Sequence, residues 1–125
     1  MPAAVDEQTA KARAMSEGDL FNEVATLLKG LGWHYFHIPA TAYRHGVRAG
    51  FPDLVTVRDG KLIFAELKRE RETLLPEQWE WAQELGRVCG AGRRGGTGRE
   101  GVRYFVWRPS NLLSGEIAEI LAGNR

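Results

Sequence analysis

Residues 51–68, FPDLVTVRDGKLIFAELK, predict a β-hairpin that fixes which side chains meet. Two runs rich in β-branched and aromatic residues flank Asp59-Gly60, a dipeptide typical of the two-residue type I′ turn. With that turn, the register places Asp53 opposite Glu66, in a pair without mutual hydrogen bonds, where side chains lie closest. Because like charges directly opposite each other destabilise a sheet, these two carboxyl groups need a compensating partner.

The faces of this hairpin indicate its place in the domain. Both faces carry mostly apolar side chains, a pattern typical of central strands covered on both sides. Asp53, Glu66 and Lys68 lie at the end away from the turn. Lys68 shares a face with Glu66 because side chains alternate along a strand.

Composition and charge restrict the class of protein. A chain of 125 residues forms about one domain, and its formal net charge of +1 favours no partner by bulk attraction. However, 13 of the 17 basic residues are Arg, which suits bidentate contacts with phosphate. The single cysteine, Cys89, excludes an internal disulfide or a cysteine zinc site and predicts a reducing, intracellular setting. We expect neither a transmembrane helix nor a secretory signal.

Hydrophobic periodicity and turn residues predict an α/β domain with the order αβββαβα. Residues 1–15 predict a loose N-terminal arm, with a partly helical arm as the alternative, and residues 16–125 predict the domain. Ser16 is a candidate N-cap for the first helix. The predicted helices cover residues 17–30, 76–88 and 111–122, the strands 33–38, 102–107 and the hairpin, and the loops 39–50, 69–75 and 90–101.

Asp53 and Glu66 are the candidate metal ligands. Facing carboxylates cost free energy unless a cation or a shared proton relieves their repulsion. Mg²⁺ suits such a pair because it binds one or two carboxylates, keeps several waters and completes its shell with substrate phosphate. The alternative is a proline turn before a strand and an ordinary charge at a strand end.

Three further polar residues are candidates for the same site. Lys68 would neutralise phosphate charge or orient a water, unless it is a solvated lysine at a strand end. Gln78 falls on the apolar face of helix 76–88, where a buried amide needs partners, and the alternative is bonding to nearby backbone. Glu23 lies at the edge of the apolar stripe of the first helix, either as a surface residue or as a further carboxylate facing the metal.

Two basic segments are candidates for binding a phosphate backbone without reading sequence. The first lies just before the hairpin, and the second is a Gly/Arg loop. For both segments, a solvated or disordered loop is the alternative. The candidate DNA-binding residues are Tyr43, Arg44, His45 and Arg48 in the first segment and Arg93, Arg94 and Arg99 in the second.

Several short motifs follow one another along the chain. They are a first helix carrying Glu within residues 16–33, Gly50-Phe51-Pro52-Asp53-Leu54, Glu66-Leu67-Lys68, Pro76-Glu77-Gln78 and Val106-Trp107-Arg108-Pro109. In order and spacing, over about residues 16–110, the chain resembles the PD-(D/E)XK nuclease superfamily. The closer resemblance is to its VRR-NUC family, the virus-type replication-repair nucleases. One departure is Leu75, where a Ser or Thr helix cap would be usual.

The resemblance implies a fold and a set of site roles. The fold would be a single restriction-endonuclease-like domain with an αβββαβ core, whose mixed central sheet is flanked by helices. Asp53 and Glu66 would bind Mg²⁺ or Mn²⁺, with the Leu67 carbonyl as an extra ligand. Lys68 would position or activate the attacking water, and Gln78 would support that water or the lysine. Glu23 would bind the metal directly or through water.

The resemblance also implies an activity, the metal-dependent hydrolysis of DNA phosphodiester bonds. Stand-alone viral members resemble Holliday-junction resolvases that act as homodimers, because two-fold symmetry supplies two symmetric cuts. This implies branched DNA as substrate, a role in DNA repair or recombination, and a cytoplasmic location, in the host cytoplasm if the protein comes from a bacteriophage. Two alternatives stay open: a nickase or flap-type nuclease, and a DNA-binding accessory protein without catalysis.

Overall fold

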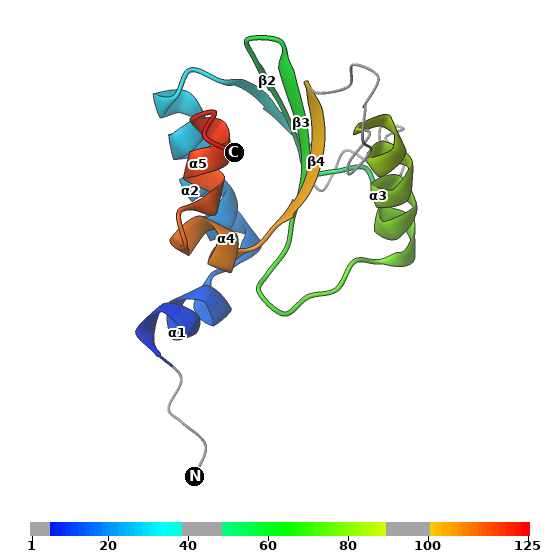
Figure 1. The fold of residues 1–125 in the computed structure, drawn as a ribbon. Helices are drawn as coiled ribbons and strands as arrows, with labels where there is room; N and C mark the ends of the chain where they lie inside the picture. Colours follow the sequence, from blue (N-terminus) through cyan, green and yellow to red (C-terminus); the bar gives the residue numbers. More distant parts are fainter. Residues whose placement is uncertain (1–5, 39–48, 90–100) are drawn as a thin grey trace.

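A computed structural model gives the fold and describes residues 6–38, 49–89 and 101–125. It is a mixed α/β arrangement in which helices flank one sheet on both sides (Figure 1). The predicted α/β class is confirmed at this level. The elements are α1 (Glu7–Ala14), α2 (Glu17–Gly30), β1 (His34–His37), β2 (Leu54–Arg58), β3 (Lys61–Leu67), α3 (Pro76–Cys89), β4 (Val102–Trp107), α4 (Pro109–Leu113) and α5 (Glu116–Leu121).

The sheet has the strand order β1-β2-β3-β4, with β1–β2 and β2–β3 antiparallel and β3–β4 parallel. The hairpin register is the predicted one, since Arg58 pairs with Lys61 and Leu54 pairs with Ala65. The turn residues Asp59 and Gly60 have φ angles of 49° and 77°, and a type I′ turn requires positive φ at both positions. β2 and β3 are the central strands, as their apolar faces predict.

The main core lies between the sheet and the helices α2, α4 and α5, whereas α3 covers the other face (Figure 1). Ser16 begins α2 as predicted, because its Oγ accepts the N–H of Asp19 at 3.0 Å. Trp33 ties the sheet side to α5 by donating its Nε1–H to the Leu121 carbonyl at 2.9 Å. The buried core residues are Leu20, Val24, Leu28, Trp33, Leu54, Ile63, Ala65, Leu67, Trp107, Ile117, Ile120 and Leu121.

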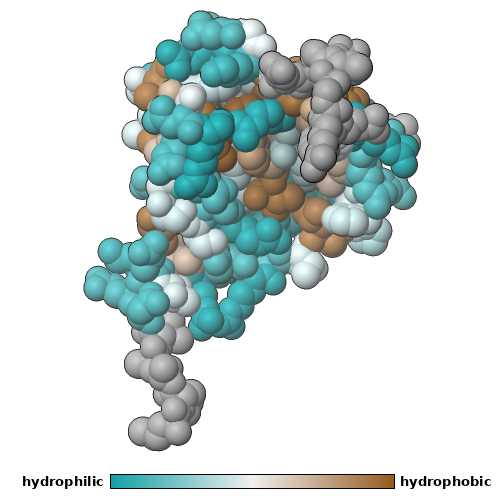
Figure 2. All heavy atoms as spheres, viewed as in Figure 1, coloured by the Kyte–Doolittle hydropathy of each residue, from teal (hydrophilic) through white to brown (hydrophobic). Residues whose placement is uncertain are grey.

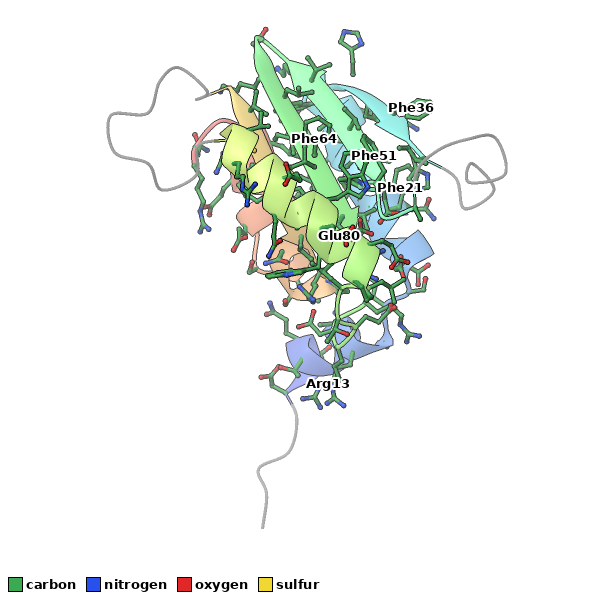
Figure 3. All side chains as sticks on the ribbon, turned by 90° about the vertical axis from the view of Figure 1, so that its right-hand side faces the viewer. Arg13, Phe21, Phe36, Phe51, Phe64 and Glu80 are labelled. Carbon is green, nitrogen blue, oxygen red and sulfur yellow. The ribbon has the colours of Figure 1, made fainter. Side chains whose placement is uncertain are left out.

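The face under α3 is packed by aromatic rings. The ring centroid of Phe51 lies 4.9 Å from that of Trp81 on α3 and 6.1 Å from that of Phe64 on β3. Figure 3 shows Phe51 and Phe64 beside this helix and Phe36 farther out, on β1. Phe36 and Val57 are exposed on this side, so the predicted cover on both faces holds for β3 but not for β2. Figure 2 shows apolar surface between the sheet and α3 and hydrophilic surface over α1.

At the two ends of the chain, the structure corrects one helical prediction and agrees with the alternative given for the other, the partly helical N-terminal arm. The single helix predicted over 111–122 is wrong, because α4 and α5 are separated at Gly115, whose φ is 86°. A right-handed helix cannot continue through a positive φ. The arm predicted over 1–15 contains α1, which Asp6 begins by accepting the Thr9 N–H at 2.7 Å. Within the described ranges, no helix combines the length and apolar character needed to cross a membrane.

Gly50 sets how closely the segment before β2 approaches α3. Its φ is 88°, a conformation that favours glycine, and a Cβ at this position would overlap the Glu77 carbonyl. Next to it, the Ala49 carbonyl accepts the Nε1–H of Trp81 at 3.1 Å. These contacts fix the first turn of α3, which contains Gln78, beside the start of β2.

We expect Gly50→Ala to lower the free energy of unfolding by about 2–4 kcal/mol, because backbone strain and overlap with the α3 backbone add. Gly86→Ala, toward the C-terminal end of α3, is the matched control, because a Cβ there meets nothing within 4 Å. That control should raise the free energy of unfolding by about 0.5–1 kcal/mol. Urea denaturation followed by circular dichroism measures both, and similar effects of the two changes would contradict the role of Gly50.

Candidate active site

Polar residues from four elements converge at one end of the sheet. Asp53 directly precedes β2, Glu66 and Lys68 lie at the end of β3, and Gln78 lies in the first turn of α3. The N-terminus of α2, with Glu17, reaches the same end, since the charge of Glu17 acts on Glu66. Four of the five residues predicted for the catalytic centre are therefore brought together.

Asp53 is held at the point where the hairpin ladder ends. It lies one residue beyond the paired part of β2, so the same register places it opposite Glu66. Its Oδ2 accepts the N–H of Leu67 at 2.9 Å. Its main-chain carbonyl accepts the N–H of Ile38 at 2.8 Å, which ties Asp53 to the end of β1. The backbone of Asp53 is thus held from the end of β1, and its carboxylate is held from β3.

The carbonyl of Leu67 lies on the same side of β3 as Asp53. The N–H of Lys68 donates to the Trp107 carbonyl of β4 at 3.0 Å, and successive residues of a strand bond to opposite neighbours. Leu67 therefore turns both of its main-chain groups toward β2, and its N–H meets Asp53 there. Two carboxyl groups and one carbonyl oxygen are directed to the same place.

Glu66 is only 2% exposed, and its environment favours the protonated form. Burial, then the hydrogen bond and the negative charge of Asp53, raise the pKa of Glu66 from 4.5 to about 9, although the positive charge of Lys68 acts in the opposite direction. The predicted repulsion between the two carboxyl groups is thus relieved by a proton when no cation is bound.

Gln78 contacts both the helix start and Glu66. Its Oε1 accepts the N–H of Leu75 at 2.8 Å, and its Nε2 donates to Oε1 of Glu66 at 3.1 Å. The first bond is half of a capping box, in which the side chain three residues into the helix returns to the cap residue. It supports the helix start where Leu75 lacks a capping hydroxyl. The two alternatives for Gln78, backbone capping and a site contact, are both realised.

Lys68 is 5% exposed and is a buried residue rather than a solvated strand-end lysine. Its backbone is fixed by the bond to Trp107, and its side chain leaves β3 on the same face as Glu66. Its positive charge acts on the carboxyl groups of both Glu66 and Glu17. The ammonium therefore lies among acids in a place with little water, where its charge acts strongly.

Glu17 is a site residue that the sequence reasoning did not identify. Its carboxyl group hydrogen-bonds with Glu72, in the segment between β3 and α3. Although Glu17 is exposed, the limited desolvation of its carboxyl group, then the charge and hydrogen bond of Glu72, raise the pKa of Glu17, with a further contribution from the charge of Asp53. A second pair of carboxyl groups thus lies next to the first.

Glu23, the residue expected to act from this helix, lies elsewhere. It is exposed and lines a surface groove with Met15, Asn22 and Leu113. The helical periodicity of α2 distinguishes Glu17 from Glu23. At 100° per residue, Glu17 lies about 20° from the centre of the apolar stripe, and Glu23 lies about 100° from it. Both acids are exposed, so the informative signal was the alignment of Glu17 with the centre of the apolar stripe in the first helical turn.

Tyr104 of β4 also faces the acids. It pairs with Phe64 and shares the face of Glu66. Burial, then the charges of Glu66 and Asp53, raise the pKa of the Tyr104 phenol to about 12. The phenol therefore stays protonated at neutral pH and keeps an O–H donor on the face of the carboxyl pair.

The predicted DNA-binding residues lie outside the described residues, and their roles stay predictions. They are Tyr43, Arg44, His45, Arg48, Arg93, Arg94 and Arg99.

The donors at the end of the hairpin suit a small divalent cation. Within residues 6–38, 49–89 and 101–125, no cluster of three or more His, Cys, Asp or Glu side chains forms a complete metal-binding group. Mg²⁺ does not require one, because it binds through one or two carboxylates and keeps waters in its shell. The carboxyl groups of Asp53 and Glu66 and the carbonyl of Leu67 are hard oxygen donors of this kind. The residues therefore fit the predicted ion.

The proton on Glu66 predicts a dependence of stability on pH. Because the pKa of Glu66 is raised in the folded state from 4.5 to about 9, its contribution to stability is complete below pH 4.5 and is lost as the pH rises to 9. In this window, metal-free protein should lose up to about 1.4 kcal/mol of unfolding free energy per pH unit.

Urea denaturation in buffers with a chelator, from pH 5 to pH 9, measures this slope. Glu66→Gln should flatten the slope, whereas Asp59→Asn, which removes an exposed carboxylate in the hairpin turn, should leave it unchanged. Equal slopes for the parent protein and Glu66→Gln would contradict the protonated state of Glu66.

Comparison with known proteins assigns no family to this arrangement. No protein-family model matches the chain, and no curated protein matches it. The function must therefore be inferred from the chemistry of the residues at the end of the hairpin.

Proposed function

We propose that this protein is a metal-dependent DNA endonuclease that hydrolyses phosphodiester bonds. The observation that carries the proposal is the hairpin register, which sets Asp53 opposite Glu66 at a strand end. Buried Lys68 and the amide of Gln78 complete the arrangement. A purely structural carboxyl pair does not need a buried lysine, an amide and a main-chain carbonyl beside it, whereas phosphodiester hydrolysis can use each of these groups.

The site would hold Mg²⁺ or Mn²⁺ through Asp53, Glu66 and the Leu67 carbonyl, with Glu17 acting through water. When bound, such an ion polarises the phosphate, supplies hydroxide and stabilises the leaving oxygen. Glu17 takes the role expected of Glu23, because Glu17 is the residue of α2 whose charge acts on the carboxyl pair.

The side chains of the protein itself would orient and neutralise the reacting groups. Lys68 donates hydrogen bonds to the attacking water and reduces the negative charge on the phosphate. Gln78 binds one oxygen of Glu66 and so fixes the rotation of that carboxyl group, which leaves its other oxygen for the metal. Both contributions depend on position and not on proton transfer.

We further propose that the substrate is branched DNA and that the enzyme acts as a homodimer of the VRR-NUC type in the PD-(D/E)XK superfamily. The order αβββαβ, with a mixed four-stranded sheet between helices, agrees with the fold that the resemblance implies. The Arg-rich segments around residues 43–48 and 93–99 would bind the phosphate backbone.

Asp53→Asn should abolish cleavage and leave DNA binding intact, because it removes a metal ligand and little else. The assay compares a synthetic four-way junction, a flap and a linear duplex, each with Mg²⁺, and the oligomeric mass is measured by light scattering. We expect paired, symmetric cuts in the junction by a dimer. The same reaction with a chelator should give no product.

The other outcomes separate the alternatives. Nicks in any duplex would contradict junction resolution and favour a nickase, and cuts confined to the flap would favour a flap nuclease. If the protein binds DNA but cuts no substrate with Mg²⁺ or Mn²⁺, the proposed activity is wrong and a DNA-binding accessory role gains support.

Two acids of the same helix provide a matched test of the α2 contribution. Glu17→Gln should lower the cleavage rate about 10- to 100-fold, the usual effect of losing a group that acts through a metal-bound water. Glu23→Gln removes the same charge from the same helix but from the surface groove, and it should have no effect. A larger loss from Glu23→Gln than from Glu17→Gln would reverse the assignment.

A further inference from the structure

Arg108 follows the last residue of β4 and points to the face of the candidate active site. Its backbone is still extended, with φ of −121° and ψ of 164°, so side chains continue to alternate at this position. Trp107 is fully buried in the core under α2 and α5. Arg108 therefore projects from the opposite face of the sheet, which is the face of Glu66 and Lys68.

The register of the two parallel strands places Arg108 beside Lys68. Leu67 pairs with Trp107, and the N–H of Lys68 donates to the Trp107 carbonyl at 3.0 Å. One residue further on, Lys68 and Arg108 are neighbours on one face. Two cations side by side repel each other, as the two carboxyl groups of the hairpin do.

The guanidinium of Arg108 is held in place without an acidic partner. Its NH2 group donates to the main-chain carbonyl of Glu72 at 2.8 Å. Its backbone is fixed on both sides by Asn111, through bonds of 2.8 Å and 2.9 Å. In the part of the chain that the structure describes, no carboxylate oxygen lies within 4.0 Å of the charged nitrogens of Arg108 or Lys68.

We propose that Arg108 binds a phosphate of the DNA backbone next to the phosphate that Lys68 faces. The inference rests on the proposed function and adds a substrate-binding residue to it. A guanidinium has five N–H donors in a rigid fork, and one bond to Glu72 leaves the fork able to bind two phosphate oxygens. The anchored side chain needs no rearrangement, and the bound phosphate relieves the repulsion between the two cations.

Arg103 provides a close control on the same strand. Its NH1 group donates to a main-chain carbonyl, that of Arg125, at 2.8 Å, as Arg108 does to Glu72. It pairs with Ile63 and so lies on the opposite face of the sheet. Arg103→Gln and Arg108→Gln therefore remove the same charge and the same kind of hydrogen bond from opposite faces of the sheet. Arg103→Gln also removes a guanidinium that lies over the Phe105 ring, 4.7 Å from its centroid, and thermal unfolding accounts for that contact.

The test measures DNA affinity across salt concentrations by fluorescence anisotropy, with Asp53→Asn added to every variant so that the DNA stays intact. Arg108→Gln should weaken binding to a four-way junction about tenfold and reduce the slope of log affinity against log salt by about one, the effect of losing one phosphate contact. Arg103→Gln should leave affinity and slope unchanged. Thermal unfolding of each variant reports any loss of structure.

Arg108→Lys keeps the charge but not the fork and covers the case in which Arg108→Gln fails to fold. It should retain the slope and weaken binding about threefold, because one bidentate contact is lost. If Arg108→Gln lowers thermal stability but changes neither affinity nor slope, Arg108 only secures the segment of Glu72 and the inference is overturned. Absence of DNA binding by the parent protein would overturn it too. Binding that depends on Arg108 in a protein that cuts nothing would leave the inference intact and refute only the nuclease.

Discussion

The close approach of two carboxyl groups, Asp53 and Glu66, is the constraint on which the rest of the site depends. A type I′ turn fixes the register, and the register leaves the pair no way to separate. The surrounding groups then reduce the free-energy cost of this repulsion. The N–H of Leu67 binds Asp53, Gln78 binds Glu66, and the charge of Lys68 opposes the rise in the pKa of Glu66.

The packing on the α3 side serves the same arrangement. Gly50 allows the backbone before β2 to touch the first turn of α3, and Trp81 secures that contact from the helix. Gln78 lies in this turn, and its single side chain both caps the helix and reaches Glu66. Leu75 has no side chain that can cap α3, and Gln78 supplies the capping hydrogen bond instead. The start of α3 is therefore coupled to the orientation of the Glu66 carboxyl group.

Local sequence patterns correctly predicted the features that depend on neighbouring residues, such as turns, helix caps and helix faces. The Asp59-Gly60 turn gave the register, Ser16 gave the start of α2, and the polar residue on an apolar stripe gave Gln78. The failures have physical causes as well. Gly115 has a positive φ and separates α4 from α5, and the spacing of apolar residues does not reveal such a break. Glu17 was not identified from the sequence, although its angle on the stripe distinguishes it from Glu23. Tyr104 and Arg108 depend on the pairing of β3 with β4, across a long connection whose register no turn specifies.

The central position of β3 gives the site two parts that differ in how firmly they are held. Glu66 belongs to a strand bonded on both sides. Asp53 is bonded to Leu67 of that same strand, and Lys68 is bonded to Trp107 of β4. Residues in a central strand leave their places only at a free energy close to that of unfolding the whole domain, so the amide hydrogens of Glu66 and Lys68 belong to the slowly exchanging class. Glu17 and Gln78 come from first turns of helices, which open at a lower free energy. A bulky polymer can therefore be admitted by movement of the helix ends while the central carboxyl groups stay fixed.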